Sequence, residues 1–355
     1  MTGVQDHRRG THDSLPTVSV CMATLNAATV LDECLGRLRA QDYPADRVEL
    51  VVADGGSSDH TLEIVERYGG RVLANPRKTG ESGKALAVRA ARHDLILMLD
   101  SDNWLPSDDW LRTMVEPLAE ERIMMSEPLA YTWRPEGGYI ERYCSLLGMN
   151  DPLCLFLGNY DRFCTLTGTW TQVPHTEIDR GTYLEVRLTS AGVPTVGANG
   201  AIFRRHFLQA ANRGDYLFDI DVIAEAIAAL GEVWIAKVKV GIIHTYCESD
   251  WRKFWRKQCR RVQDYLFHKS TGVRRYDWES GALRRSSGFG LTRFVISTVL
   301  VVPLVIQAVR GFSRRPDSAW LFHVPACWLT LVAYSWGVLA GLVRKREASR
   351  ATWSQ

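Results

Sequence analysis

The sequence lacks the marks of several protein classes. It has no glycine period, no sustained heptad repeat and only eight cysteines in 355 residues, which excludes collagen-like, coiled-coil and disulfide-scaffold proteins. No two cysteines form a CxxC pair, so a zinc ribbon is not expected, and scattered thiols fit a reducing compartment. The opening stretch MTGVQDHRRGTHDSLP has no apolar core and is not expected to be a secretory signal. With 46% apolar and 23% charged residues, the chain is too apolar to be disordered.

Charge is unevenly distributed along the chain. The formal net charge of +3 hides a basic C-terminal part, because residues 251–355 hold 19 Lys and Arg against 5 Asp and Glu. Residues 1–250 hold 24 basic against 35 acidic side chains. An acidic body with a basic tail predicts an anionic partner for the tail, either a nucleic acid or a membrane surface.

Two long apolar runs in the tail favour the membrane. Residues 320–343 carry no Asp, Glu, Lys or Arg and reach the ~20 residues that a helix needs to cross a hydrocarbon core. Residues 294–309, interrupted by Pro303 and Gln307, fall short of that length. The stretch 310–315 between them is basic, so two full spans conflict with the positive-inside tendency, and a hairpin lying partly in one leaflet removes the conflict. We therefore expect two hydrophobic membrane helices; a buried core helix is the alternative for each run.

Strands and helices alternate in the first third of the chain. Apolar, β-branched runs predict strands, and apolar residues at helical spacing predict helices between them. The expected strands are residues 17–23, 48–53, 71–74 and 95–99, and the expected helices are residues 30–38, 61–68 and 83–92. This order predicts an α/β fold with a doubly wound, mostly parallel central sheet.

Polar side chains follow three of these strands directly. Thr24 and Asn26 come after the first strand, Asp54 after the second, and Asp100 and Asp102 after the fourth. Open α/β sheets bind ligands at the carboxyl ends of their strands, so these residues predict one binding site. Because residues i and i+2 of an extended chain point the same way, Asp100 and Asp102 can share one ligand. Hard oxygen donors of this kind suit Mg²⁺ or Mn²⁺, which typically bridges a diphosphate.

The stretches TVSVCMATLNA, VELVVADGGSSDHT, TGESGKALAVRAA and HDLILMLDSDNWL carry a family resemblance. Over residues 16–125 the chain resembles the nucleotide-sugar half of a family 2 glycosyltransferase with the GT-A fold. The resemblance implies that Thr24 and Asp54 contact the base and ribose of a nucleotide diphospho-sugar, and that Asn26 belongs to the same site. It also implies that Lys84 lies near the base or phosphates, although Lys84 read alone can be a solvated helix residue.

For the metal site, the resemblance implies that Asp100 touches the ribose or the metal and that Asp102 is the main protein ligand. His244, at the end of an apolar strand at 238–243, completes the metal site in some members of the family. Read without the family, a lone histidine is more often structural.

The acceptor side is expected in the second half of the chain. The stretch around Asn199 (GANGAIFRR) resembles the glycine-rich segment that precedes the catalytic acid in this family; alternatively it is a turn that leads into a strand. Asp219 and Asp221 stand at the start of an apolar helical run, where a carboxylate can take the proton of an acceptor hydroxyl. The family usually shows Glu-Asp here, but Phe218 replaces the first acid. The base is therefore Asp219 or Asp221, or both acids only stabilise the helix start.

A basic, aromatic segment at 251–265 follows. Gln258 and Arg261 match the QxxRW motif of membrane-embedded members, with Val262 in place of tryptophan, and Arg261 is expected to bind a diphosphate or lipid phosphate. A basic amphipathic helix resting on anionic headgroups is the alternative.

These observations predict an inverting, metal-dependent glycosyltransferase that uses Mg²⁺ or Mn²⁺. Its expected partners are a nucleotide diphospho-sugar, a lipid-linked or glycan acceptor, and the cytoplasmic face of the cell membrane, without nucleic acid. A nucleotidyltransferase or a GT-A-like membrane protein without activity is the alternative. The expected division of the chain is a flexible N-terminus (1–15), a nucleotide-sugar half (16–125), an acceptor half (126–250), an interfacial segment (251–290), two membrane helices (291–346) and a tail (347–355).

Overall fold

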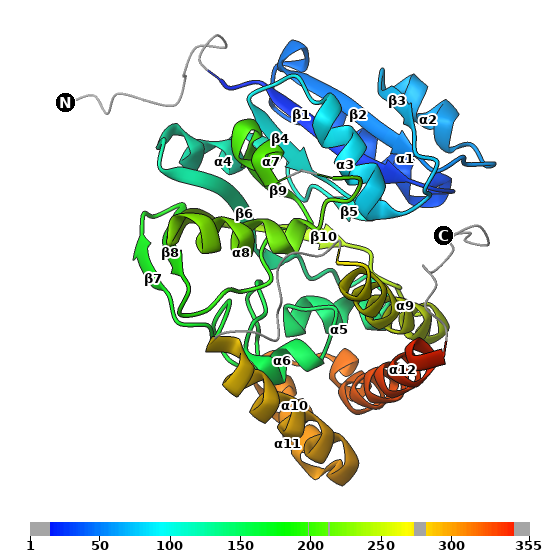
Figure 1. The fold of residues 1–355 in the computed structure, drawn as a ribbon, viewed down its shortest axis with the longest axis vertical. Helices are drawn as coiled ribbons and strands as arrows, with labels where there is room; N and C mark the ends of the chain where they lie inside the picture. The colour runs from blue at the N-terminus through cyan, green and yellow to red at the C-terminus, as the bar shows by residue number, and fades with distance from the viewer. Residues whose placement is uncertain (1–14, 198, 212–213, 273–281, 344–355) are drawn as a thin grey trace, which may run out of the picture.

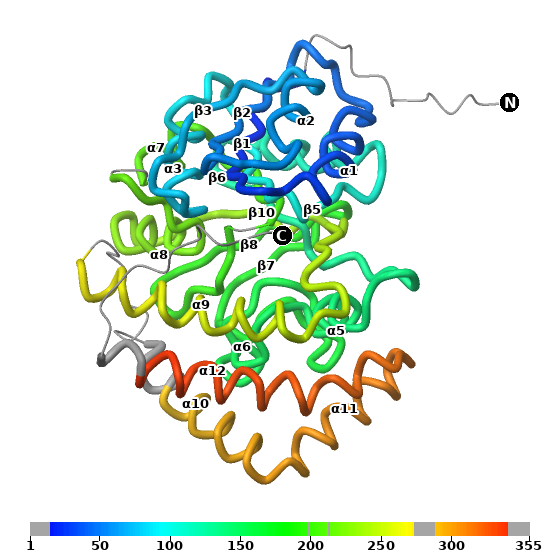
Figure 2. The backbone as a smooth tube through the Cα atoms, turned by 90° about the vertical axis from the view of Figure 1, so that its right-hand side faces the viewer, coloured from blue at the N-terminus to red at the C-terminus, as the bar shows by residue number. Residues whose placement is uncertain are grey.

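The computed structural model describes residues 15–197, 199–211, 214–272 and 282–343, so the expected N-terminal segment and tail lie almost wholly outside the described residues. Figures 1 and 2 show a body built around one sheet, with the C-terminal helices gathered at the end farthest from the first strands. The strands are β1 (Val18–Thr24), β2 (Val48–Asp54), β3 (Arg71–Ala74), β4 (Leu95–Met98), β5 (Asn103–Trp104), β6 (Ile123–Tyr131), β7 (Thr176–Asp179), β8 (Tyr183–Thr189), β9 (Ala201–Arg204) and β10 (Glu232–His244). The helices are α1 (Ala28–Arg39), α2 (Thr61–Arg67), α3 (Gly80–Ala90), α4 (Trp110–Val115), α5 (Tyr139–Leu147), α6 (Leu153–Leu157), α7 (Arg205–Ala211), α8 (Asp219–Leu230), α9 (Trp251–Ser270), α10 (Ala282–Leu300), α11 (Val302–Arg314) and α12 (His323–Val343).

The first half of the sheet follows the sequence-based expectation. Strands β3, β2, β1 and β4 lie side by side and are all parallel, each within a residue or two of its predicted bounds. The side chains of β1 and β4 are buried on both faces, which explains why these two strands read as continuous apolar runs, whereas β3 is partly exposed. In register, Thr24 at the end of β1 stands opposite Asp54 at the end of β2. The α/β fold class is confirmed.

The second half of the sheet mixes strand directions. Strand β9 lies antiparallel between β4 and β6, and the long strand β10 pairs parallel with β6 and antiparallel with β8. Strand β6 begins at Ile123 and crosses the expected boundary between residues 125 and 126. The nucleotide-sugar half and the acceptor half therefore share one continuous sheet.

The first hydrophobic run of the tail is a bent pair of helices rather than one straight helix. Helices α10 and α11 meet at Val301, whose φ is 63°, and their axes differ by 93°. Pro303 lies in the first turn of α11, where its missing N–H is tolerated, whereas a continuous helix would lose a hydrogen bond there. Residues 318–339 form the one described helical stretch that is long and apolar enough to span a membrane by itself, which agrees with the expectation that the first run falls short of that length.

The second hydrophobic run, α12, lies along α9 instead of standing away from the body (Figure 2). A methyl group at Gly337 of α12 would come within 2.1 Å of the Val262 side chain of α9, so the two helices approach closely because both residues are small. A core cluster that includes Tyr143, Phe254 and Trp320 joins the C-terminal helices to the body. The helices α10, α11 and α12 are thus part of the folded body.

Candidate active site

A pocket of about 370 Å³ lies at the carboxyl ends of β1 and β4. Thr24, Asp100 and Asp102 line it from the sheet, Lys84 lines it from α3, and Asp219 lines it from the start of α8. One wall comes from α9. Two of the three predicted groups at strand ends, Thr24 and the Asp100–Asp102 pair, therefore line one pocket together with a carboxylate from the second half of the chain.

Lys84 joins two carboxylates across the pocket. Its Nζ lies 2.6 Å from Asp219 Oδ2 and 3.4 Å from Asp100 Oδ1. Burial raises the pKa of Asp219 above its ordinary value, and the ammonium of Lys84 opposes that rise. Lys84 thus keeps a buried carboxylate available in its charged form.

Asp102 forms a second group with His244 and Lys257. Its Oδ2 lies 3.4 Å from His244 Nε2 and 3.3 Å from Lys257 Nζ. Although burial raises the pKa of Asp102, the neighbouring His244 and Lys257 outweigh that effect, so its pKa lies well below the usual range. Asp102 is therefore an anion at neutral pH.

The donor set at Asp102 fits a hard divalent ion. Within the described ranges no group of three or more His, Cys, Asp or Glu side chains is arranged to hold a metal. Mg²⁺ usually keeps waters and binds one or two protein groups together with substrate phosphates, so two protein ligands are enough. Neighbouring octahedral ligands at about 2.1 Å from an ion lie about 3 Å apart, close to the 3.4 Å between Asp102 Oδ2 and His244 Nε2.

Two of the predicted nucleotide contacts have local structural partners. The carboxylate of Asp54 accepts hydrogen bonds from the backbone N–H groups of Gly56 and Ser57 and from the hydroxyls of Thr24 and Ser57. Asn26 accepts from the N–H of Ser58. Neither Asp54 nor Asn26 is among the described residues that line the pocket, whereas Thr24 is. Asp54 therefore shapes the loop after β2 and orients Thr24.

The two candidate bases are placed differently. Asp219 lines the pocket, whereas Asp221 is 2% exposed and is not among the described lining residues. Asn199 lines the pocket from the segment before β9, and its Nδ2 donates a hydrogen bond to Tyr131 Oη at 3.0 Å. Asp219 and Asn199 thus both line the pocket from the second half of the chain.

The predicted phosphate-binding pair on α9 has protein partners. Gln258 is fully buried; it donates to the carbonyl of Asn150 at 2.8 Å and accepts from Arg261 Nη1 at 2.8 Å. Arg261 lines the pocket and also lies 3.4 Å from Asp151 Oδ2. The motif therefore fixes α9 to the 150–151 turn and leaves Arg261 at the pocket wall.

Sequence reasoning missed two residues near the metal candidates. Lys257 lies one helical turn before Arg261 in a basic segment, so its position on the same face was a usable signal. Asn150, whose Nδ2 lies 3.2 Å from His244 Nδ1, has no sequence signal in a region without a recognisable motif.

A family model described as glycosyl transferase family 2 matches residues 19–135. The chain contains a glycosyl transferase family 2 domain. The match includes Lys84, Asp100 and Asp102 and ends before Asp219 and His244, so it covers part of the pocket lining.

Curated relatives of the family 2 domain match it over part of their length. The poly(ribitol-phosphate) β-N-acetylglucosaminyltransferase TarS of Staphylococcus aureus is 34% identical over 93 residues, which are 24% of this chain and 16% of TarS. The glycosyltransferase AglE of Haloferax volcanii is 26% identical over 143 residues, which are 38% of this chain and 47% of AglE. The chain therefore spans less than half the length of these relatives.

Nearly the whole chain is similar in structure to the mannosyltransferase PcManGT from Pyrobaculum calidifontis. That structure was solved in complex with GDP-Man and Mn²⁺. The likeness covers 93% of this chain and 89% of PcManGT, with a TM-score of 0.53 and 17% sequence identity. This similarity shows that the fold is GT-A.

Proposed function

We propose that this chain is an inverting glycosyltransferase that moves a sugar from a nucleotide diphospho-sugar to an acceptor at a membrane surface. The observation that carries the proposal is that one pocket holds both the Asp102–His244 pair and Asp219. The first is suited to a diphosphate with its metal, and the second to an acceptor hydroxyl.

On the donor side, Asp102 and His244 would hold Mg²⁺ or Mn²⁺, which supplies Lewis-acid stabilisation of the leaving diphosphate when bound. Thr24 and Asp100 lie on the same side and would contact the nucleoside and its phosphates. Lys257 would orient a phosphate oxygen, because its Nζ lies 3.3 Å from the Asp102 carboxylate at the proposed metal position. The GDP-Man and Mn²⁺ complex of PcManGT supports this assignment.

On the acceptor side, Asp219 would accept the proton of the attacking hydroxyl. The acceptor oxygen forms its bond to the anomeric carbon while the bond from that carbon to the diphosphate oxygen breaks, so the configuration inverts. Lys84 would keep Asp219 charged before the proton arrives. Asn199 would bind a second acceptor hydroxyl from the same wall.

The proposed membrane contact rests on an exposed apolar surface, which we call the apolar face. It consists of Phe289, Leu291, Val295, Ile296, Val299, Leu300, Val302, Val305, Ile306, Val309, Phe312, Leu321, Trp328, Val332, Trp336, Val338 and Leu339. Single exposed apolar residues are normal on a protein surface, but this many on neighbouring helices favour contact with another apolar phase. The apolar face also lies in the basic part of the chain, as contact with anionic lipid headgroups would require.

The return of α11 to the body favours a hairpin in one leaflet, with the body on the cytoplasmic side. Arg314 donates a hydrogen bond to the carbonyl of Thr165 at 2.8 Å, and Asp317 accepts one from Trp133 Nε1 at 2.7 Å. The basic stretch 310–315 at the end of α11 is thus on the same side as the body. Two full spans would separate these partners across the bilayer.

Nucleotide release by detergent-solubilised protein tests the activity. GDP-mannose and UDP-N-acetylglucosamine are offered with farnesyl phosphate as acceptor probe, in Mn²⁺ or EDTA. We expect release that needs Mn²⁺ and that Asp102→Asn abolishes, while Asp179→Asn, a change at an exposed carboxylate, leaves it intact. Release that is equal in EDTA would refute the metal assignment.

Labelling in sealed inverted vesicles, whose cytoplasmic face is outward, tests the topology. A cysteine introduced by Ser313→Cys should react with an impermeant maleimide before detergent is added, above the level of the parent protein. Labelling of this cysteine only after detergent would show that the stretch lies across the bilayer.

A further inference from the structure

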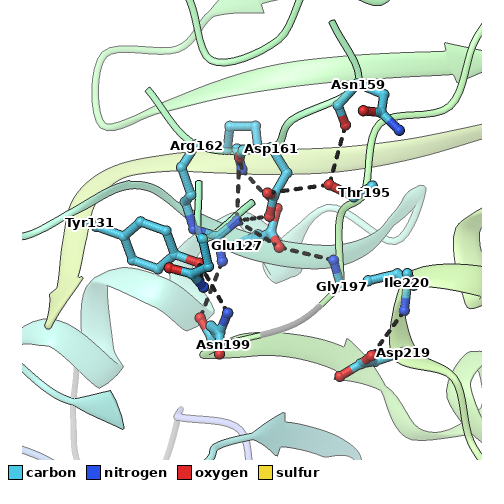
Figure 3. A network of polar contacts seen from close by, with 12 residues as sticks. Glu127, Tyr131, Asn159, Asp161, Arg162, Thr195, Gly197, Asn199, Asp219 and Ile220 are labelled. Atoms are coloured by element: carbon cyan, nitrogen blue, oxygen red, sulfur yellow. Dashed lines mark hydrogen bonds and ion pairs between the residues drawn. The ribbon is translucent and has the colours of Figure 1, made fainter. Parts of the chain in front are cut away.

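Four charged side chains meet beneath the acceptor side of the pocket (Figure 3). Glu127 of β6 stands directly opposite Lys237 of β10, and its Oε2 lies 2.7 Å from Lys237 Nζ. Glu127 Oε1 lies 2.8 Å from Arg162 Nη1, and Arg162 also pairs with Asp161. Glu127, Arg162 and Lys237 are each fully buried. We call these four residues the ionic cluster.

Stability alone is a poor reason for the ionic cluster. Removing charges from water is costly, and well-packed apolar residues in place of a buried ion pair are often neutral or stabilising. Strands β6 and β10 are already joined by backbone pairing on both sides of Glu127 and Lys237. The ionic cluster is therefore expected to bind polar groups, such as backbone N–H and C=O groups, that apolar side chains cannot bind.

The bonds that leave the ionic cluster reach the segment 195–200, of which residues 195–197, 199 and 200 are described. Glu127 Oε1 accepts from the backbone N–H of Gly197 at 2.9 Å, and Arg162 Nη2 donates to the carbonyl of Asn199 at 3.2 Å. The segment has left-handed backbone at Gly197 (φ 120°), Asn199 (φ 54°) and Gly200 (φ 86°). Glycine adopts this backbone readily, whereas at Asn199 it costs conformational energy that the surrounding contacts must offset.

This segment forms the acceptor wall of the pocket. A methyl group on Gly197 would meet the carbonyl oxygen of Asp219 at 2.5 Å, so the segment lies directly against the start of α8. Two residues further on, Asn199 reaches the pocket and donates to Tyr131 Oη, while the guanidinium of Arg162 lies 5.5 Å from the Tyr131 ring (Figure 3). The backbone that the ionic cluster holds thus places both acceptor-side residues.

We propose that Glu127 and Arg162 are positioning residues for the acceptor: through Gly197 and Asn199 they fix the wall against Asp219 without touching the donor. The catalytic part of this inference rests on the proposed function, whereas its structural part does not.

The test compares Arg162→Lys with Arg180→Lys. The first variant keeps the charge of the ionic cluster but removes the Nη2 donor to Asn199. The second variant makes the same Arg-to-Lys change at Arg180, which pairs with another buried carboxylate, Glu185 Oε2, at 2.7 Å. Glu185 is not among the described pocket-lining residues. The double variant Glu127→Gln with Lys237→Met removes one negative and one positive charge, so it tests the cluster again if Arg162→Lys does not fold.

Hydrogen–deuterium exchange gives a readout that needs no substrate. Because hydrogen bonds to charged groups hold this backbone, we expect exchange of the 195–200 amides to rise about tenfold in Arg162→Lys. Exchange in α3 should not change, and neither region should change in Arg180→Lys. Unchanged exchange at 195–200 in Arg162→Lys and in the double variant would overturn the inference.

Activity gives the second readout. With GDP-mannose and farnesyl phosphate, we expect the ratio of transfer to donor hydrolysis to fall at least about tenfold, because the lost hydrogen bonds involve charged groups. Affinity for GDP with Mn²⁺ should stay within twofold. A parallel fall in GDP affinity would mean general damage and would overturn the positioning role. If the parent protein binds no nucleotide, the proposed function fails, while the exchange result still decides the structural part.

Discussion

Lys84 offers the sharpest test of the electrostatics of the pocket. In Lys84→Met, Asp219 and Asp100 lose the ammonium that lies 2.6 Å and 3.4 Å from them. The side chains of Lys84 and Asp219 are 15% and 14% exposed, so water replaces the lost partner poorly. The variant therefore leaves like charges facing each other at a mostly buried site.

The expected loss of stability follows from this burial. At an effective dielectric constant of about 20, unit charges at the Lys84–Asp219 distance attract by about 6 kcal/mol, part of which offsets the loss of hydration. Removing one partner of a buried pair typically costs about 3–5 kcal/mol, and we expect that loss near pH 7.5. The matched control is Lys239→Met, whose partner Asp179 lies at the same 2.6 Å but on the surface, with side-chain exposures of 33% and 62%. There we expect little or no loss, because water screens and replaces the exposed partner.

Urea unfolding at about pH 7.5 and about pH 5 measures both losses. Burial already raises the pKa of Asp219, and removal of Lys84 raises it further. When the pKa of an acid is higher in the folded state than in the unfolded state, lowering the pH favours the folded state. The loss of unfolding free energy in Lys84→Met should therefore be smaller at about pH 5 than at about pH 7.5. The reasoning would be refuted if Lys84→Met and Lys239→Met lost the same unfolding free energy, or if the loss in Lys84→Met were the same at both pH values.

The remaining predictions concern the pocket and its loops. Asp219→Asn should lower kcat about 10²–10⁴-fold with unchanged nucleotide affinity, whereas Asp221→Asn should keep most activity; rates and binding are measured together, and the opposite result would reverse the base assignment. Because burial raises the pKa of Asp219, the acid limb of the pH–rate profile should lie above the range of an ordinary Asp, and should move higher in Lys84→Met; a limb at the ordinary position in both would contradict the role of Asp219. Asp102→Asn should weaken Mn²⁺ binding at least about tenfold by calorimetry, and unchanged binding would remove Asp102 from the ligand set. Asp54→Ala should cost about 1–3 kcal/mol of stability, because it leaves several N–H and O–H donors without their acceptor; a loss of nucleotide affinity without a loss of stability would restore Asp54 as a direct contact.

The donor half of the site was predictable because its signals are local. Each of Thr24, Asp100 and Asp102 follows a strand within a few residues, and parallel strands place their carboxyl ends at one edge. The same rule also selected Asp54 and Asn26, which are not among the described residues that line the pocket. Their carboxylate and amide are used by neighbouring backbone groups, a competition that sequence spacing does not reveal.

The acceptor half was less predictable because its contacts join distant parts of the chain. Glu127 meets Lys237 because β10 pairs with β6 in parallel more than 100 residues later in the chain, and the sequence pattern does not show that pairing. The departure from the QxxRW motif at Val262 also has a tertiary cause. Val262 faces Gly337 of α12 at close range, where a tryptophan has no room.

The anchors of α11 have a consequence for how the chain is made. Arg314 and Asp317 dock on Thr165 and Trp133, which leave the ribosome about 150 to 185 residues earlier. Since domains generally fold in the order of their synthesis, the docking surface exists before the hairpin is complete. On the proposed membrane contact, the hairpin would reach the bilayer after its docking surface has folded, and its delivery would need no translocation of the basic stretch.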